Sequence, residues 1–182
     1  IDAGITVCIA AGNRSFKIDE ATGTDYNNSM VADGDTIYYH RGSSPYGDAS
    51  LNGGQRAIIV GSMDSTVYFF DSTLDQKATY SETGPGVDIY AAGTNIMSST
   101  STTNKWGSGS QNYYLNSSYK QTNISGTSMA TPQVVGIGAC LLELYPNWSP
   151  AKLKQYLLDT AGSVIYDTGT NNDWTNTRSL KG

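Results

Sequence analysis

The sequence predicts an α/β layer fold with a mostly parallel sheet. Two short, continuously apolar runs, at residues 5–11 and 57–63, are typical of strands that are covered on both faces. Two later segments, at residues 129–144 and 149–161, have the length and the end signals of helices. Strands combined with helices in this way indicate α/β layering, and a length of 182 residues suits one domain over 1–182.

The first apolar run ends at Gly12-Asn13, where a long polar excursion begins. This excursion covers residues 14–56 and is rich in Gly, Asn, Asp, Ser and Tyr, with a small hairpin expected near Thr36 to His40. Loops of this length within one domain often carry a function of their own.

The strand predicted at 57–63 is followed by weaker strand signals. We expect short strands at Val67–Phe70 and at Val87–Ala92. A second polar excursion at 98–122 is rich in Ser, Thr, Asn and Tyr and predicts a hairpin or a surface loop.

The segment Met129–Leu144 gives the strongest helix signal. Apolar residues would occupy nearly the whole circumference of this helix, which predicts that it is buried in the centre of a domain. Pro146 cannot continue it. A second helix is expected to start at Ser149, a good N-cap followed by Pro150, and to stop at Gly162. Its apolar face would consist of Leu153, Tyr156, Leu157 and Ala161.

Charge and hydropathy exclude several classes of protein. The formal net charge is −5, and no cluster of Lys and Arg exists that would bind nucleic acid or an anionic membrane surface. Residues 129–144 are too few and too polar to span a bilayer. No signal peptide opens the chain, because Ile1 leads directly into a core-like segment. We therefore expect a partner segment upstream of this chain.

The chain offers few residues for a metal centre. Cys8 and Cys140 both lie in apolar runs and are expected to be buried free thiols. The one histidine, His40, is expected to be a surface loop residue. A metal site needs more ligands than these, so none is predicted. The acidic residues of the first excursion are expected to form a solvated face rather than a calcium site. They are Asp19, Glu20, Asp25, Asp33 and Asp35.

The segment Ser125–Pro132 has the properties that a nucleophilic serine requires. Ser128 would stand at the first turn of the buried helix, which holds it rigidly, and Gly126 would leave it accessible. The free N–H groups and the positive end of a helix stabilise the negative charge of an acyl-transfer transition state.

This segment resembles the serine motif of the subtilisin-like serine proteases, the subtilases. Further stretches match the family in the same order along the chain: Ala10–Asn13, Ala57–Ser62, Tyr80–Gly93 and Tyr145–Ser149. The resemblance implies a three-layer subtilisin-like fold with a mostly parallel central sheet, of which this chain is the carboxyl-terminal part.

The resemblance also assigns roles to residues. Ser128 would attack the scissile carbonyl, and the side-chain amide of Asn13 would bind the oxyanion together with the Ser128 N–H. The Asp and His of the triad precede Asn13 in the family, so they would come from the upstream segment. His40 does not match the family's histidine. The residues expected to contact substrate are Ala10, Ala11, Gly12, Gly126 and Thr127.

The function indicated is a serine endopeptidase that works through an acyl-enzyme and acts on protein or peptide substrates. No cofactor is required for that chemistry, although many subtilases hold structural calcium. The expected location is secreted or extracellular, or within a virion or cell-surface assembly. The alternative is a non-catalytic, subtilase-like structural or peptide-binding module of such an assembly. Gln133 and Ala92 depart from the family pattern at positions that do not touch the chemistry directly. The excursion at 14–56 is also longer than the common pattern.

Overall fold

The structure is a computed structural model. It describes residues 1–20, 22–38, 40–41, 57–64, 76–101, 103, 110–162, 165–166 and 179–180. The strand expected at Val67–Phe70 lies outside the described residues.

The central sheet is built around β4 (Ile58–Asp64). β1 (Cys8–Ala10) and β6 (Ile89–Ala92) both pair with β4 in parallel, and Val60 faces a residue of each strand, so they flank it on opposite sides. The far end of β4 pairs antiparallel with β5 (Gln76–Lys77), which leads on to β10 (Ile165–Tyr166) and β11 (Ser179–Leu180). The predicted strand at 57–63 is therefore confirmed as the centre of a mostly parallel sheet.

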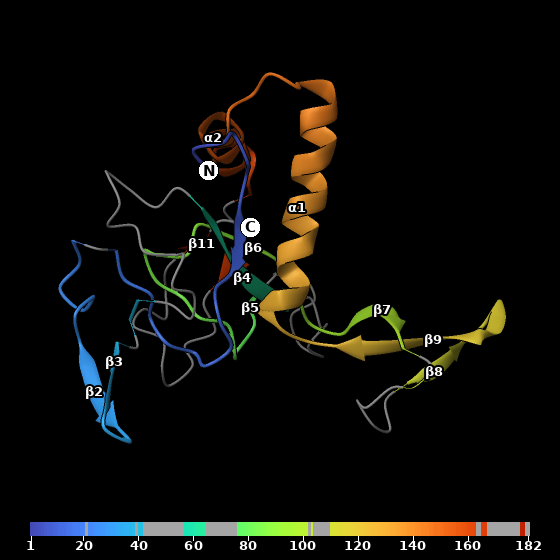
Figure 1. The fold of residues 1–182 in the computed structure, drawn as a ribbon, viewed down its shortest axis with the longest axis horizontal. Helices are drawn as coiled ribbons and strands as arrows, with labels where there is room; N and C mark the ends of the chain where they lie inside the picture. Colours follow the sequence, from blue (N-terminus) through green and yellow to red (C-terminus); the bar gives the residue numbers. More distant parts are fainter. Residues whose placement is uncertain are drawn as a thin grey trace.

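The hydrophobic core lies on both faces of this sheet because successive β4 side chains point to opposite sides. Ile59 packs on one face in a cluster that also contains Ala11, Ile18, Ala57, Val87 and Tyr90. Ile58 and Val60 pack on the other face against two helices, α1 (Thr127–Leu144) and α2 (Pro150–Thr160). Figure 1 shows α1 standing beside the sheet with α2 near its upper end.

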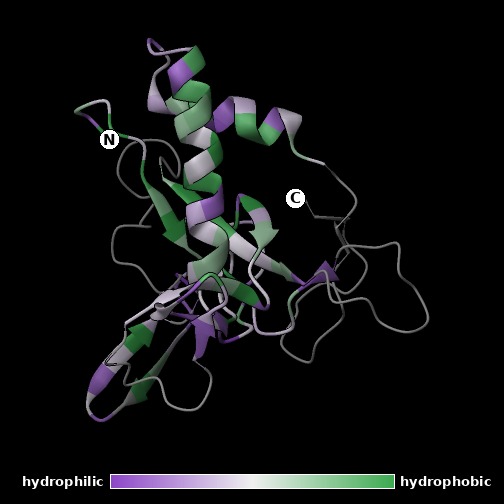
Figure 2. Cartoon of the chain, turned by 90° about the vertical axis from the view of Figure 1, so that its right-hand side faces the viewer, coloured by the Kyte–Doolittle hydropathy of each residue, from purple (hydrophilic) through white to green (hydrophobic). Residues whose placement is uncertain are grey.

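Helix α1 buries only one of its sides. Ala130, Val134 and Gly138 are buried, whereas Val135 and Ile137 are 50% and 55% exposed. Hydrophobic residues recur along the whole helix in Figure 2. The prediction of a helix buried on all sides is therefore wrong for this chain, because none of the described elements covers the second side.

The same observation corrects one cysteine. Both cysteines are free thiols, as predicted. Cys8 is half-buried, but Cys140 is exposed because it lies on the uncovered side of α1. The prediction of a buried Cys140 is therefore wrong.

Helix α2 has the predicted start and is tied to the sheet by an ion pair. The Ser149 hydroxyl accepts the Lys152 N–H at 3.2 Å and caps the helix. Lys154 donates to the Asp88 carboxylate at 2.8 Å, and Asp88 also accepts the Ile59 N–H at 2.8 Å. Burial raises the pKa of Asp88, while the Lys154 charge opposes that rise. Asp88 is thus a structural residue, as expected from the sequence.

The polar excursions contain two small antiparallel sheets. β2 (Ser29–Ala32) and β3 (Asp35–Tyr38) form a hairpin whose two-residue turn has positive φ at Asp33 and Gly34. The predicted hairpin is therefore present, with its turn three residues before the predicted start. β7 (Ile96–Thr100), β8 (Gln111–Tyr113) and β9 (Asn116–Ile124) form a three-stranded sheet that extends away from the main sheet beyond α1 (Figure 1).

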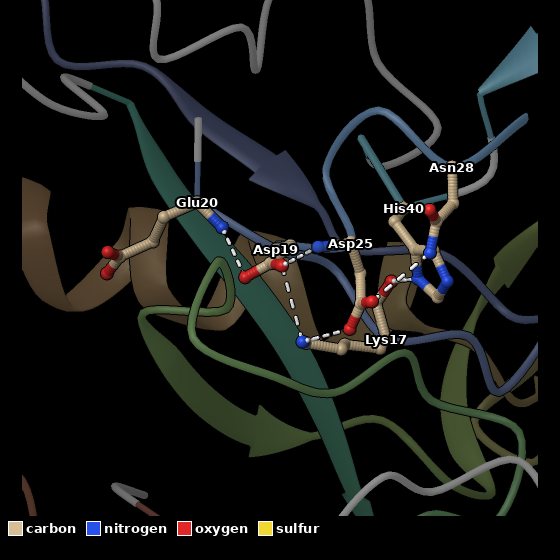
Figure 3. Close-up of polar contacts among 6 residues, drawn as sticks. All are labelled: Lys17, Asp19, Glu20, Asp25, Asn28 and His40. Carbon is tan, nitrogen blue, oxygen red and sulfur yellow. Dashed lines mark hydrogen bonds and ion pairs between the residues drawn. The ribbon is translucent and has the colours of Figure 1, made fainter. Parts of the chain in front are cut away.

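Part of the acidic cluster is paired with a lysine instead of being solvated. The Lys17 ammonium lies between the carboxylates of Asp25, at 2.6 Å, and Asp19, at 3.3 Å (Figure 3). Asp19 is only 6% exposed and accepts the N–H groups of Glu20 and Asp25. The prediction of a solvated face is therefore wrong for Asp19, because Lys17 compensates its charge. Neither described helix is long and apolar enough to cross a membrane.

Candidate active site

The proposed site lies where β1 ends and α1 begins. Ala11 and Gly12 follow β1 and lead to Asn13, whose side chain is exposed. Thr127 opens α1 and is fully buried, and Ser128 follows as an exposed residue. These segments are far apart in the sequence, and the fold brings them into direct contact.

Two hydrogen bonds connect Asn13 to the residue before Ser128. The Asn13 Oδ1 atom accepts the Thr127 N–H at 2.9 Å and the Thr127 hydroxyl at 3.0 Å. A backbone N–H can only donate, so the oxygen of the amide must face Thr127. The Nδ2 group of Asn13 therefore points away from Thr127, and no residue in the described ranges accepts its N–H groups.

Gly126 lies close to that amide group. A Cβ atom on Gly126 would lie 3.3 Å from the Asn13 Nδ2 and 3.6 Å from the Met129 sulfur. The Gly126 N–H donates to the Gly93 carbonyl at 2.9 Å, which fixes the approach to α1. A glycine therefore leaves the space next to the amide donors open.

The first turn of α1 supplies a second donor. The N–H groups of Met129 and Ala130 both donate to the Gly126 carbonyl, whereas no described residue accepts the Ser128 N–H. The first turn carries no acidic residue, so the positive end of the helix is not offset there. Among the described residues, neither the Ser128 N–H nor the Asn13 Nδ2 group thus has a hydrogen-bond acceptor.

Gly12 is held from two directions. Its N–H donates to the Thr127 hydroxyl at 3.2 Å, and its carbonyl accepts the Glu82 N–H at 3.0 Å. Its φ of +128° is unfavourable for other residues. A Cβ atom here would also lie 2.5 Å from the Glu82 carboxyl carbon. Only glycine fits between Thr127 and Glu82.

Glu82 is the residue of this region that the sequence analysis missed. It is 3% exposed, and its Oε2 atom is buried without a hydrogen-bond partner among the described residues. Burial raises its pKa to about 7, although the charge of Arg14 opposes that rise. The available signal was an acidic residue between the small residues Ser81 and Thr83, just before a core strand.

The other residues named from the sequence occupy different positions. Ala11 is 1% exposed and belongs to the core, so its side chain faces away from the surface. Ala10 is half-buried at the end of β1. His40 lies in the loop of the acidic cluster, where its Nδ1–H donates to the Lys17 carbonyl at 2.7 Å. Gln133 donates to the Ala92 carbonyl at 2.6 Å, so two of the positions that depart from the family pattern contact each other.

No group of three or more His, Cys, Asp or Glu residues suited to a metal ion occurs in the described ranges.

Comparisons with known proteins identify the family of this chain. The model described as "Subtilase family" matches residues 1–179. The subtilase-type proteinase isp6 of Schizosaccharomyces pombe is 32% identical over 150 residues, which cover 81% of this chain and 26% of that protein. An extracellular serine proteinase of Thermus sp. strain Rt41A is 30% identical over 158 residues, 87% of this chain and 26% of that protein.

A solved structure shows the same fold. The structure of fervidolysin from Fervidobacterium pennivorans, described as a keratinolytic enzyme related to subtilisin, has a TM-score of 0.63 and 21% identity, over 98% of this chain and 21% of that chain. This chain thus spans about a quarter of the length of these relatives. It belongs to the subtilase family and corresponds to the C-terminal part of that family's catalytic region.

Proposed function

We propose that this chain carries the nucleophile and the oxyanion-binding half of a serine endopeptidase. The observation that supports this most directly is the pair of hydrogen bonds from Thr127 to the Asn13 Oδ1, at 2.9 and 3.0 Å. They orient the asparagine amide next to an exposed Ser128 at the start of α1. Membership of a family of serine peptidases agrees with this proposal.

In the proposed reaction the Ser128 hydroxyl attacks the scissile carbonyl. The oxyanion that forms accepts hydrogen bonds from the Asn13 Nδ2 group and the Ser128 N–H. A histidine of the upstream segment takes the proton of the hydroxyl and gives it to the leaving amine. Water then hydrolyses the acyl-enzyme with the same histidine as base, which regenerates Ser128.

The upstream segment that would supply His and Asp has a natural place to pack. The exposed side of α1 carries Val135, Ile137 and Cys140, and an apolar surface of this kind is normally covered. The outer edge of β1 is unpaired among the described strands, since β1 pairs with β4 alone. Because the chain spans 26% of each of the two curated relatives named above, we propose that the preceding part of the domain pairs with β1 and covers α1.

The substrate would be a polypeptide that passes over the end of β1. Ala10 is small and lies half-buried at the end of β1, so we propose that the pocket for the residue before the cut takes a large apolar side chain. Gly126, Thr127 and the Ala11 backbone would complete this binding surface. We propose that no cofactor takes part in the reaction. Lys17 lies between the carboxylates of the acidic loop, so any structural calcium would bind elsewhere. By analogy with the Thermus relative, we propose an extracellular location.

An active-site probe tests this proposal in the complete protein. A fluorophosphonate should label Ser128, and Ser128→Ala should abolish labelling and peptide cleavage. Ser118→Ala is the matched control, since Ser118 is an exposed serine of β9, and it should leave both unchanged. A folded protein that neither reacts with the probe nor cleaves peptides would refute the endopeptidase and favour a non-catalytic module.

A further inference from the structure

The back of the proposed oxyanion site is formed by a buried acid. The Glu82 carboxyl occupies the space where a Gly12 side chain would be: its oxygens lie 2.4 and 2.7 Å from the position of a Cβ. Glu82 is 3% exposed, and within the described part of the chain its Oε2 atom has no partner. A buried polar group without a partner is rare and often belongs to a functional site.

The hydrogen bonds of Gly12 connect Glu82 to the residues of the proposed site. The Glu82 N–H donates to the Gly12 carbonyl, and the Gly12 N–H donates to the hydroxyl of Thr127. That same hydroxyl and the Thr127 N–H hold the Asn13 amide. A displacement of Gly12 would therefore move Asn13 directly and would also disturb the Thr127 bonds that orient its amide.

The surroundings favour the uncharged form of Glu82. The positive charge of Arg14 lowers the pKa of Glu82 and so opposes the effect of burial. Among the ion pairs of the described residues, however, none joins Arg14 to Glu82. The ammonium of Lys77 donates to the carbonyls of Ala78 and Ser81. The first turn of α1 carries no acidic residue. A charged carboxylate at this position would need water or Arg14 as a partner, and the Gly12–Arg14 segment would have to move to admit either.

We propose that Glu82 is a positioning residue of the oxyanion site: its uncharged carboxyl group supports Gly12 and keeps Asn13 aimed at the substrate, and its ionisation displaces them. This inference rests on the proposed function for its effect on catalysis. Burial, which raises the pKa of Glu82 to about 7, brings this switch into the neutral pH range.

The pH profile of peptide cleavage by the complete protein tests the proposal. Wild-type kcat should fall above pH 7, and Glu82→Gln, which is permanently neutral and nearly isosteric, should lack this fall. With a pKa of about 7, about one molecule in eleven is uncharged at pH 8, so kcat of the variant should exceed that of the wild type about tenfold at pH 8 and equal it at pH 6. KM should change little. Glu143→Gln, an exposed glutamate of α1, is the control and should keep the wild-type profile. Identical profiles for the wild type and Glu82→Gln would overturn the proposal.

A second measurement does not depend on activity. The Asn13 side-chain NH₂ signals in a ¹⁵N–¹H spectrum, identified by their loss in Asn13→Leu, should shift between pH 6 and 8 in the wild type. They should follow the same titration as the Glu82 carboxyl carbon, and the wild-type titration alone suffices if Glu82→Gln does not fold. Asn13 signals that do not respond as Glu82 titrates would refute the inference. If Ser128 does not react with the fluorophosphonate but the Asn13 signals still follow the Glu82 titration, only the proposed function would be refuted.

Discussion

The buried carboxyl of Glu82 should make the folded protein less stable as the pH rises. Its pKa is 4.5 in an unfolded chain and about 7 in the folded protein, so the folded state binds more protons between these values. The stabilisation that results is fully present below pH 4.5 and is lost as the pH rises through 7. One pKa unit corresponds to about 1.36 kcal/mol, so the full loss is about 3 kcal/mol, of which about 2.5 kcal/mol falls between pH 5 and pH 8.

Replacing Glu82 by Gln removes this dependence. We expect Glu82→Gln to be about 2.5 kcal/mol more stable, relative to the wild type, at pH 8 than at pH 5. Urea denaturation at both pH values measures this, and subtraction removes the contribution of Asp88, whose pKa burial also raises. Glu143→Gln should show no such change. A difference below about 0.5 kcal/mol between the two pH values would show that Glu82 is not confined against Gly12 as described.

Three further substitutions test the site and its support. Asn13→Leu should lower kcat of the complete protein about 10²–10³-fold with little change in KM, the loss known for the oxyanion asparagine of subtilisin itself; an unchanged kcat would remove Asn13 from the site. Lys17→Met should destabilise the protein by about 3 kcal/mol in urea denaturation, because it leaves the buried Asp19 carboxylate without its cation; a loss under 1 kcal/mol would mean that backbone N–H groups alone hold that charge. Lys154→Met should cost about 2 kcal/mol by leaving Asp88 unpaired, and Asp88→Asn in the same background should recover part of this cost if the ion pair is responsible.

The elements that the sequence predicted correctly are those whose signals are local. The continuous apolar run of β4 and the Ser-Pro start of α2 can be recognised without knowing their neighbours. The roles of Asn13 and Ser128 came from motif resemblance, and the structure places Asn13 against Thr127, beside Ser128.

The failures concern residues whose environment depends on distant parts of the chain. Apolar residues occur on all sides of α1, which indicates that every side of the helix needs to be covered. The pattern does not show whether this chain supplies that cover. The prediction of a buried Cys140 is wrong for this reason. The sequence predicts a solvated Asp19 because the position of Lys17 beside it depends on how the loop folds. Glu82 was missed because only the tertiary structure brings it against Gly12.

The contact between Gln133 and Ala92 has a consequence for the acid tolerance of the fold. This hydrogen bond joins the second turn of α1 to Ala92, the last residue of β6. Subtilases usually have histidine at the position of Gln133. Imidazole changes charge near pH 6.5, whereas a carboxamide stays neutral at any physiological acidity. The junction of helix and strand at this point should thus keep the same bond in an acidified medium and in a mildly alkaline one.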